Sequence, residues 1–265
     1  MDLKASFKNM LTHPLVRGIN IDDVQTVRVH RQLIDSKPNL KRLMRRWYQE
    51  LVPSVEATQH LDGKMVEIGC GAGFLDEVIP QVIKTDVMVN PYADQIVDAM
   101  SLPYANESLR ALFLTGVFHH IPDAAQFLSE AERTLQVGGR LSLIEAHNSG
   151  FAKWVTNHMP HYEYFDDRAD WMTSKDRERM SGANLSTAWI IFFRDQELFR
   201  RRFPKLRLHS FNYHTFLSFY LSGGMSYRSF VPNFCWPIVE GMETICQPFM
   251  KQIGVSITLH IEKVA

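Results

Sequence analysis

A glycine-rich segment is the part of this chain best suited to hold a nucleotide-type ligand. It spans residues 67–73 and reads E-I-G-C-G-A-G, between the apolar pair Met65 and Val66 and a helical pattern that begins at Phe74. In a strand–turn–helix context, the first glycine permits a tight turn and the second lets a ligand approach the backbone. The start of the helix offers unpaired N–H groups to an anion.

The spacing of the glycines distinguishes between ligands. A dinucleotide fingerprint, G-x-G-x-x-G/A, would need a small residue at position 74, where Phe74 is too bulky for close helix packing. The observed form, E-x-G-x-G-x-G, resembles motif I of the class I S-adenosylmethionine-dependent methyltransferases. In that family the acidic residue orders the loop and the glycines cradle the methionine part of the cofactor.

Residues further along the chain follow the order of the same family. Asp86 ends a second strand-like run, and a carboxylate offers two acceptor oxygens to the ribose diol. Residues 98–104 (D-A-M-S-L-P-Y) are similar to the D-A-x-x-L-P-F segment, in which the Asp and the next amide meet the adenine ring. The resemblance implies cofactor contacts at Glu67, Gly69, Cys70, Gly71, Gly73, Asp86, Val87, Asp98, Ala99 and Thr115.

The elements that position these residues are expected to form an α/β fold. Residues 111–115 predict a buried strand, which the run H-H-I-P-D follows, as it often does in the family. Residues 124–135 predict an amphipathic helix stopped by Gly138 and Gly139, and residues 140–145 predict a fifth strand. Residues alternate in polarity at 205–211 and 254–262, as in a strand with one covered face, and predict two more strands. We expect a Rossmann-like, seven-stranded, mostly parallel sheet with an antiparallel last strand.

The predicted organisation is an N-terminal helical cap over residues 1–60 and a methyltransferase domain over 61–265. Helices are expected at about 22–35 and 39–51, with the second bracketed by Pro38 and Pro53. Trp47 and Tyr48 in that helix either cover the ligand or pack on the sheet, and packing is the favoured interpretation. An insertion at about 147–204 follows the fifth strand, where the family builds its acceptor specificity.

Two histidines are the predicted catalytic residues. Methyl transfer is an in-line displacement, and a hydroxyl acceptor must also lose a proton, for which histidine is suited near neutral pH. His147 is expected at the rim of the crevice, and His120, or its neighbour His119, near the methionine end. A structural role stays open for each. A carboxyl or phosphate acceptor would need no base.

No metal site is predicted. The group His161, Glu163, Asp166 and Asp167 contains metal-binding residue types, but its spacing matches no ligand template, so a network of contacts within the loop is favoured. The three cysteines also lack metal-ligand spacing and suit a reducing compartment.

Composition favours a cytoplasmic enzyme without a nucleic-acid partner. The 265 residues are 45% hydrophobic and 22% charged, with zero net charge, which argues against binding that relies on bulk electrostatics. Residues 1–10 have no apolar core, so no signal peptide is expected. The oligomeric state stays open.

The aromatic-rich region 211–250 allows two interpretations. Burial against the sheet is the favoured one; alternatively, an exposed apolar patch beside the basic residues 200–202 contacts the inner membrane surface. The distal half of the chain resembles uncharacterised bacterial methyltransferases associated with surface polysaccharides. We therefore predict methyl transfer from S-adenosylmethionine to oxygen of a small-molecule, sugar or lipid-linked acceptor. The alternative is a catalytically silent, cofactor-binding scaffold subunit.

Overall fold

A seven-stranded sheet in the order β3-β2-β1-β4-β5-β7-β6 forms the centre of the protein. The computed structural model describes residues 11–19, 23, 25–158, 163–171 and 183–265. Pairs within β3-β2-β1-β4-β5 are parallel, whereas β7 is antiparallel to both β5 and β6, which confirms the predicted fold class. The strands are β1 (Lys64–Glu67), β2 (Val82–Asp86), β3 (Gln95–Ile96), β4 (Leu109–Thr115), β5 (Leu135–Ala146), β6 (Leu206–His214) and β7 (Ser256–Lys263).

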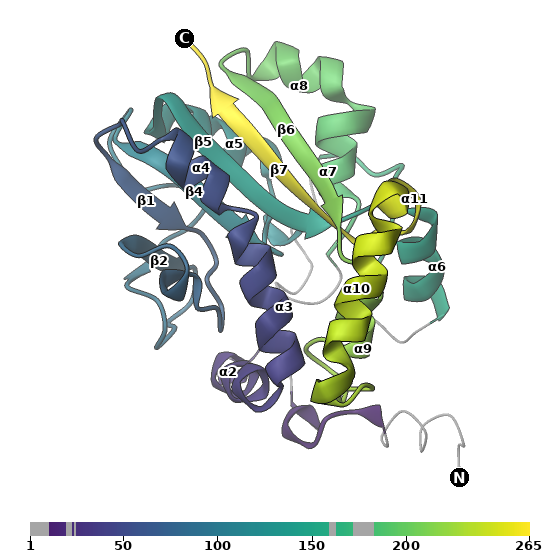
Figure 1. Cartoon of the computed structure of the whole chain (residues 1–265). Helices are drawn as coiled ribbons and strands as arrows, with labels where there is room; N and C mark the ends of the chain where they lie inside the picture. The colour runs from purple at the N-terminus through teal and green to yellow at the C-terminus, as the bar shows by residue number, and fades with distance from the viewer. Residues whose placement is uncertain (1–10, 20–22, 24, 159–162, 172–182) are drawn as a thin grey trace.

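Helices flank the sheet and extend beyond its lower edge in the view of Figure 1. The N-terminal ones are η1 (Pro14–Val16), α2 (Thr26–Ser36), α3 (Pro38–Gln49) and α4 (Val52–Ala57). The central ones are η2 (Leu75–Glu77), η3 (Phe118–His120), α5 (Ala124–Thr134), α6 (Gly150–His158), α7 (Thr187–Trp189), the π-helix η4 (Ile190–Arg194) and α8 (Gln196–Arg202). The last are α9 (Leu217–Leu221), η5 (Asn233–Cys235), α10 (Trp236–Cys246), η6 (Gln247–Phe249) and α11 (Met250–Ile253).

The central strand β4 is buried on both faces, as expected of a covered parallel sheet. Leu112 and Leu114 belong to the cluster that contains Phe127 of α5. Ala111 and Phe113 point the other way, into the cluster that contains Tyr48 of α3. The alternation follows from the two-residue period of a strand. Helix α3 therefore covers one face of the sheet while α5 covers the other.

Two local features differ from the sequence-based expectation, and Pro53, which follows α3 as expected, also belongs to the next helix. The helical pattern at Phe74 gives only the single 3₁₀ turn η2, since Pro80 prevents a longer helix. Gly138 and Gly139 lie inside β5 and do not end α5, which stops at Thr134. Pro53 is the second residue of the short helix α4, and proline fits the first turn of a helix because its missing N–H costs nothing there.

The C-terminal helices pack against the N-terminal cap. Leu43 of α3 shares a buried cluster with Trp236 and Val239 of α10. Figure 1 shows α3 and α10 side by side below the sheet. Among the described residues, no helix has the length and apolar character needed to cross a bilayer. The division of the chain at residue 60 stays a prediction.

Candidate functional site

A cavity of about 680 Å³ opens where β1, β2, β4 and β5 end. This is the position at which open α/β sheets bind their ligands. The structure brings every residue of the predicted cofactor set to its lining: Glu67, Gly69, Cys70, Gly71, Gly73, Asp86, Val87, Asp98, Ala99 and Thr115. Their individual contacts with a cofactor stay predictions.

The three glycines of the loop are each needed for a different reason. Gly69 has φ +69°, and a Cβ there would lie 2.7 Å from the Val117 side chain. A Cβ at Gly73 would lie 2.6 Å from the Tyr48 hydroxyl. Gly71 has φ +51°, but a Cβ there would meet nothing within 4 Å. Because Gly71 lines the cavity, this open space is a place where a ligand can approach the backbone.

Asp86 holds the glycine loop in position from the end of β2. Its Oδ2 accepts hydrogen bonds from the Gly71 N–H at 3.2 Å and from Asn90 Nδ2 at 2.8 Å. The Asn90 amide also donates to the Gly71 carbonyl at 2.7 Å. The sequence analysis did not identify Asn90 as part of the site. Its position soon after a strand is the only feature of the sequence that points to it. A carboxylate has about four acceptor sites, so Asp86 retains capacity for a ribose hydroxyl.

Two buried polar atoms at the cavity have no hydrogen-bond partner among the described residues: Glu67 Oε2 and Thr115 Oγ1. Burial is the main reason that the pKa of Glu67 is raised to about 8, so its carboxyl is largely protonated at neutral pH. Unsatisfied buried polar atoms are rare in proteins and call for an explanation. A polar ligand in this cavity would supply one, and the residues present therefore fit S-adenosylmethionine.

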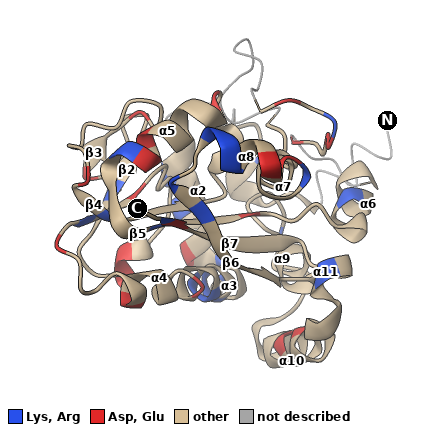
Figure 2. Cartoon of the chain, turned by 90° about the horizontal axis from the view of Figure 1, so that it is seen from above, with Lys and Arg blue, Asp and Glu red and all other residues tan. Residues whose placement is uncertain are grey.

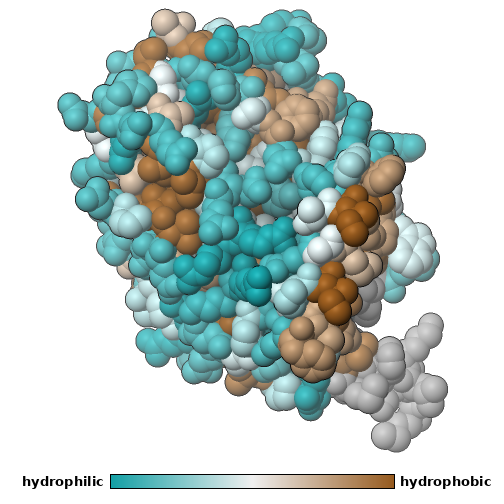
Figure 3. All heavy atoms as spheres, viewed as in Figure 1, coloured by the Kyte–Doolittle hydropathy of each residue, from teal (hydrophilic) through white to brown (hydrophobic). Residues whose placement is uncertain are grey.

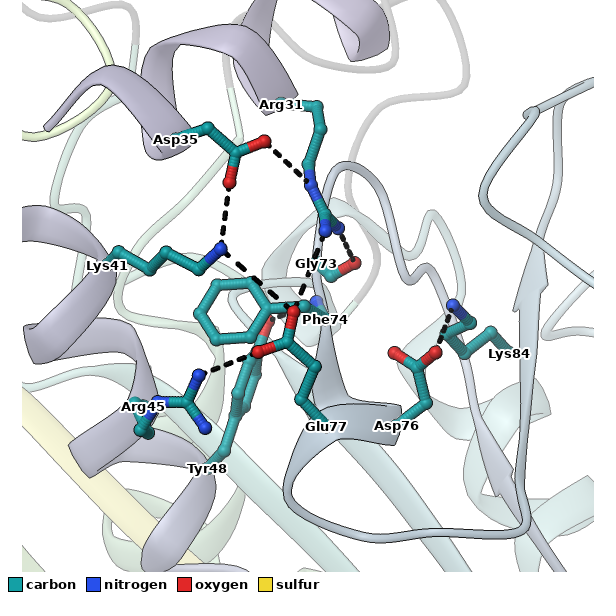
Figure 4. A network of polar contacts seen from close by, with 10 residues as sticks. All are labelled: Arg31, Asp35, Lys41, Arg45, Tyr48, Gly73, Phe74, Asp76, Glu77 and Lys84. Atoms are coloured by element: carbon teal, nitrogen blue, oxygen red, sulfur yellow. Dashed lines mark hydrogen bonds and ion pairs between the residues drawn. The ribbon is translucent and has the colours of Figure 1, made fainter. Parts of the chain in front are cut away.

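Helices α2 and α3 are fastened to the glycine loop by the network in Figure 4. Arg31 donates to the Gly73 carbonyl at 3.1 Å. Arg45 pairs with Glu77 at 2.6 Å, and Arg31 lies 3.7 Å from the same carboxylate. Both guanidinium groups lie within 6 Å of the Phe74 ring centroid. The cap and the loop are thus one connected unit.

The cap and the C-terminal region supply the remaining walls of the cavity. Trp47 and Tyr48 of α3 both line the cavity. The favoured expectation, that these two side chains only pack on the sheet, is therefore incomplete. Tyr48 is also buried in the core beside the sheet. The other lining residues from these regions include Asp23, Thr26, His30, Phe219, Tyr220 and Tyr227.

A polar cluster, buried at His119 and Glu145 and partly buried at its other two members, lies at the carboxyl ends of β4 and β5. His119 Nδ1 is 2.5 Å from Glu145 Oε2, and His119 Nε2 is 3.0 Å from Glu163 Oε1. His120 Nε2 is 3.2 Å from the same Glu163 oxygen. All four residues line the cavity. We call these residues the histidine–glutamate cluster.

Opposing effects set the charge states in this cluster. Burial disfavours a charge on His119, but Glu145 and Glu163 outweigh it and raise the pKa of His119 to about 10. For Glu163, burial is likewise outweighed by His119 and His120, which hold the pKa of this carboxyl well below its usual range. Ionised Glu163 and protonated His119 therefore stabilise each other at neutral pH.

His147 does not lie among the residues that line the cavity. Its Nε2 is 2.9 Å from the Lys251 carbonyl, and its ring packs 4.3 Å from that of Tyr213. Burial, partly offset by the bond to Lys251, lowers the pKa of His147. The expected position at the crevice rim is therefore corrected: the ring is held by backbone and aromatic contacts beside the cavity lining, not in it, and its catalytic role stays a prediction.

Only part of the acidic group in the insertion is brought together. Asp167 pairs with Lys153 at 2.7 Å, and Asp166 accepts a bond from the Arg168 N–H at 3.0 Å, as in a loop network. Glu163 instead joins the histidine–glutamate cluster, while His161 lies outside the described residues. Sequence reasoning missed Glu145 as a partner of His119. The signal was that His119 follows β4 and Glu145 lies near the end of β5, and the carboxyl ends of these neighbouring strands meet at one edge of the sheet.

Comparison with known proteins assigns a family to the region around the glycine loop. Residues 66–143 match the sequence model of a family described as "Methyltransferase domain". A curated relative, 27-O-demethylrifamycin SV methyltransferase of Amycolatopsis mediterranei, is 30% identical over the matched part. The match covers 30% of this chain and 37% of the relative.

Solved methyltransferase structures share the fold. One is an S-adenosylmethionine-dependent methyltransferase from Archaeoglobus fulgidus, with a TM-score of 0.51 and 9% identity over 87% of this chain and 97% of that one. Another is geranyl diphosphate C-methyltransferase from Streptomyces coelicolor, with a TM-score of 0.50 and 12% identity over 94% and 85% of the two chains. These structures confirm the predicted fold, and the family match applies to residues 66–143.

Proposed function

We propose that this chain, which carries a class I S-adenosylmethionine-dependent methyltransferase domain, transfers a methyl group from that cofactor to a small acceptor in the same cavity. The observation that carries the proposal is the convergence of all ten predicted cofactor residues on one cavity. Its volume of about 680 Å³ lies within the usual range for ligand pockets. The bound cofactor supplies an electrophilic methyl group.

The residues divide into two groups around the cavity. Gly71 gives the cofactor close approach to the backbone, Asp86 is assigned to the ribose, and Asp98 with the Ala99 amide is assigned to adenine. Thr115 and Glu67 offer their unsatisfied oxygens to polar groups of the cofactor. The acceptor is assigned to the side formed by α2, α9 and the histidine–glutamate cluster.

The acceptor is proposed to be a sugar, a glycolipid or another small molecule, methylated at oxygen. Aromatic rings such as those of Phe219 and Tyr220 in the lining suit the apolar face of a sugar or lipid. The histidine–glutamate cluster provides a site for the proton that a hydroxyl must release, with His120 as the first candidate acceptor. The name of the Amycolatopsis relative, which specifies an oxygen position, supports this choice.

Isotope tracing tests the proposed function. Purified protein incubated with S-adenosylmethionine carrying a labelled methyl group and a cell extract is expected to yield S-adenosylhomocysteine and a labelled product, both detected by mass spectrometry. A sugar or lipid-linked product would identify the acceptor class. Cofactor binding without any labelled product, across extracts that contain the acceptor, would favour the silent scaffold.

We also propose that α10 contacts a lipid surface. The aromatic-rich region 211–250 contains both buried and exposed residues. Trp236 is buried in the core and Phe219 lines the cavity, but one face of α10, together with residues just beyond its two ends, is exposed. Figure 3 shows hydrophobic residues along this face. We call it the α10 stripe, and it consists of Phe234 (83% exposed), Ile238 (65%), Met242 (46%), Ile245 (77%) and Phe249 (60%).

The charges of α10 support a lipid surface as the partner. Its only acidic residues, Glu240 and Glu243, face α3, where Glu240 pairs with Arg42 at 2.6 Å and Glu243 with Arg46 at 3.2 Å. Figure 2 shows no basic residue on α10. The outward face is therefore apolar and not acidic, so it suits insertion at the boundary between the headgroups and acyl chains of a membrane.

Vesicle sedimentation tests the α10 stripe. The protein is expected to sediment with anionic phospholipid vesicles, and the double variant Ile238→Ser/Ile245→Ser to remain in the supernatant, because two exposed apolar anchors are lost. Figures 1 and 2 separate α8, which carries Arg200–Arg202, from α10. Substituting these three arginines by Ser is therefore the matched control and should have the smaller effect. Equal sedimentation of wild type and the double variant would show that the α10 stripe does not contact the lipid surface.

A further inference from the structure

We infer that His119, His120 and Glu163 form a binding site for a divalent transition-metal ion. Two imidazole nitrogens and one carboxylate oxygen from these residues all lie within 4.8 Å of one another. Glu163 Oε1 is 3.0 Å from His119 Nε2 and 3.2 Å from His120 Nε2. Ligand atoms at normal bond lengths around a tetrahedral zinc ion lie roughly 3.3 Å apart. The Glu163 oxygen is therefore close to coordination spacing from both imidazole nitrogens, which lie within 4.8 Å of each other.

Glu145 gives the cluster the partner that metal-binding histidines usually have. Its Oε2 lies 2.5 Å from His119 Nδ1, on the side of the ring opposite Glu163. Its Oε1 accepts bonds from the Val117 and Phe118 N–H groups at 3.0 and 2.8 Å, which fix the carboxylate in place. A carboxylate bonded to the outer nitrogen of a ligating histidine sets the tautomer and orients the inner nitrogen toward the metal. His119 Nε2 is oriented in this way.

Charge balance also favours a divalent ion. Glu145 and Glu163 place two carboxylates beside two imidazoles, and the Glu145 and Glu163 side chains are 0% and 18% exposed. Buried charges need compensation. One divalent cation between neutral histidines would neutralise both carboxylates.

The residue types select the class of metal. Magnesium and calcium prefer sites made of oxygen atoms, whereas zinc and cobalt accept imidazole nitrogen together with carboxylate. Three protein ligands leave a coordination position for an oxygen atom in the cavity, as in catalytic zinc sites. Binding of the acceptor at that position rests on the proposed function; binding of the metal does not.

Cobalt titration tests the site in the full chain, without an affinity tag and after treatment with a chelator. Wild type is expected to bind one equivalent of Co²⁺ with a visible absorption band that Zn²⁺ abolishes. Glu163→Gln, which keeps the shape but removes the charge, should weaken Co²⁺ binding at least tenfold, and so should His120→Gln. The controls Asp167→Asn and His158→Gln, which change other groups of the insertion, should bind as wild type. Affinity for S-adenosylhomocysteine reports that each variant is folded.

Absence of the band in wild type, or equal Co²⁺ affinity in wild type and Glu163→Gln, would overturn the metal site. The result for the metal site can be distinguished from the result for the proposed methyl transfer. Methyl transfer that persists in metal-free protein shows that the proposed activity does not need the metal, while the Co²⁺ titration alone decides whether the metal site exists. Stoichiometric metal binding without methyl transfer to any acceptor keeps the metal site and removes the proposed activity.

Discussion

Gly71→Val is expected to weaken the binding of S-adenosylmethionine and S-adenosylhomocysteine severely. Wild type should bind with micromolar affinity, about 8 kcal/mol, and the variant at least 100-fold more weakly, a loss of about 3 kcal/mol. The valine side chain would enter the open space at Gly71, which lines the cavity. The φ of +51° adds backbone strain, since a β-branched residue disfavours this conformation. Isothermal titration calorimetry measures both affinities.

Gly18→Val is the matched control for this experiment. Gly18 has φ +72°, and a Cβ there would also meet nothing within 4 Å, so the strain and the free space resemble those at Gly71. Gly18 is not among the residues that line the cavity. Thermal denaturation should show similar losses of stability in both variants, while only Gly71→Val loses affinity. Binding by Gly71→Val within threefold of wild type would contradict the assignment of the loop to the cofactor.

Most of the sheet could be predicted because its signals are local. An apolar run followed by a glycine turn identifies β1, and the alternation at 254–262 identifies β7, whichever elements pack on them. The exceptions are positions where tertiary context decides. The sequence pattern at Gly138 and Gly139 predicts the end of a helix. In the structure both glycines lie in β5, whose neighbouring residues pair with β4 and β7. Pro53 reads as an end of α3, yet it equally begins α4.

The cofactor half of the site was predictable for a similar reason. Gly71, Asp86 and Asp98 each follow the end of a strand, and parallel strands bring such ends to one edge. The orientation of His147 was not predictable, because the Lys251 carbonyl and Tyr213 that hold its ring come from distant parts of the sequence. Glu163 likewise reaches His119 only through the path of the insertion, on which sequence periodicity carries no information.

His120→Ala is expected to lower turnover by about 10²-fold or more, the usual loss when an acid–base group is removed. Its imidazole lines the cavity and lies 3.2 Å from Glu163, where the hydroxyl of an acceptor can be reached. The loss is expected whether His120 accepts the proton or holds a metal ion, because both roles need the same nitrogen. The measurement is the rate of S-adenosylhomocysteine formation with the identified acceptor at saturating cofactor.

His147→Gln tests whether the loss in His120→Ala depends on the position of the histidine in the cavity, since His147 is also a histidine but is not among the residues that line it. Glutamine can still donate a bond to the Lys251 carbonyl, so the variant should fold and keep a turnover within about threefold of wild type. A loss in His147→Gln as large as that in His120→Ala would place His147 in the mechanism after all. A fully active His120→Ala protein would remove the histidine–glutamate cluster from the chemistry. His147 and His120 both follow strands of the same sheet, so the expected difference rests on the fact that His120 lines the cavity and His147 does not.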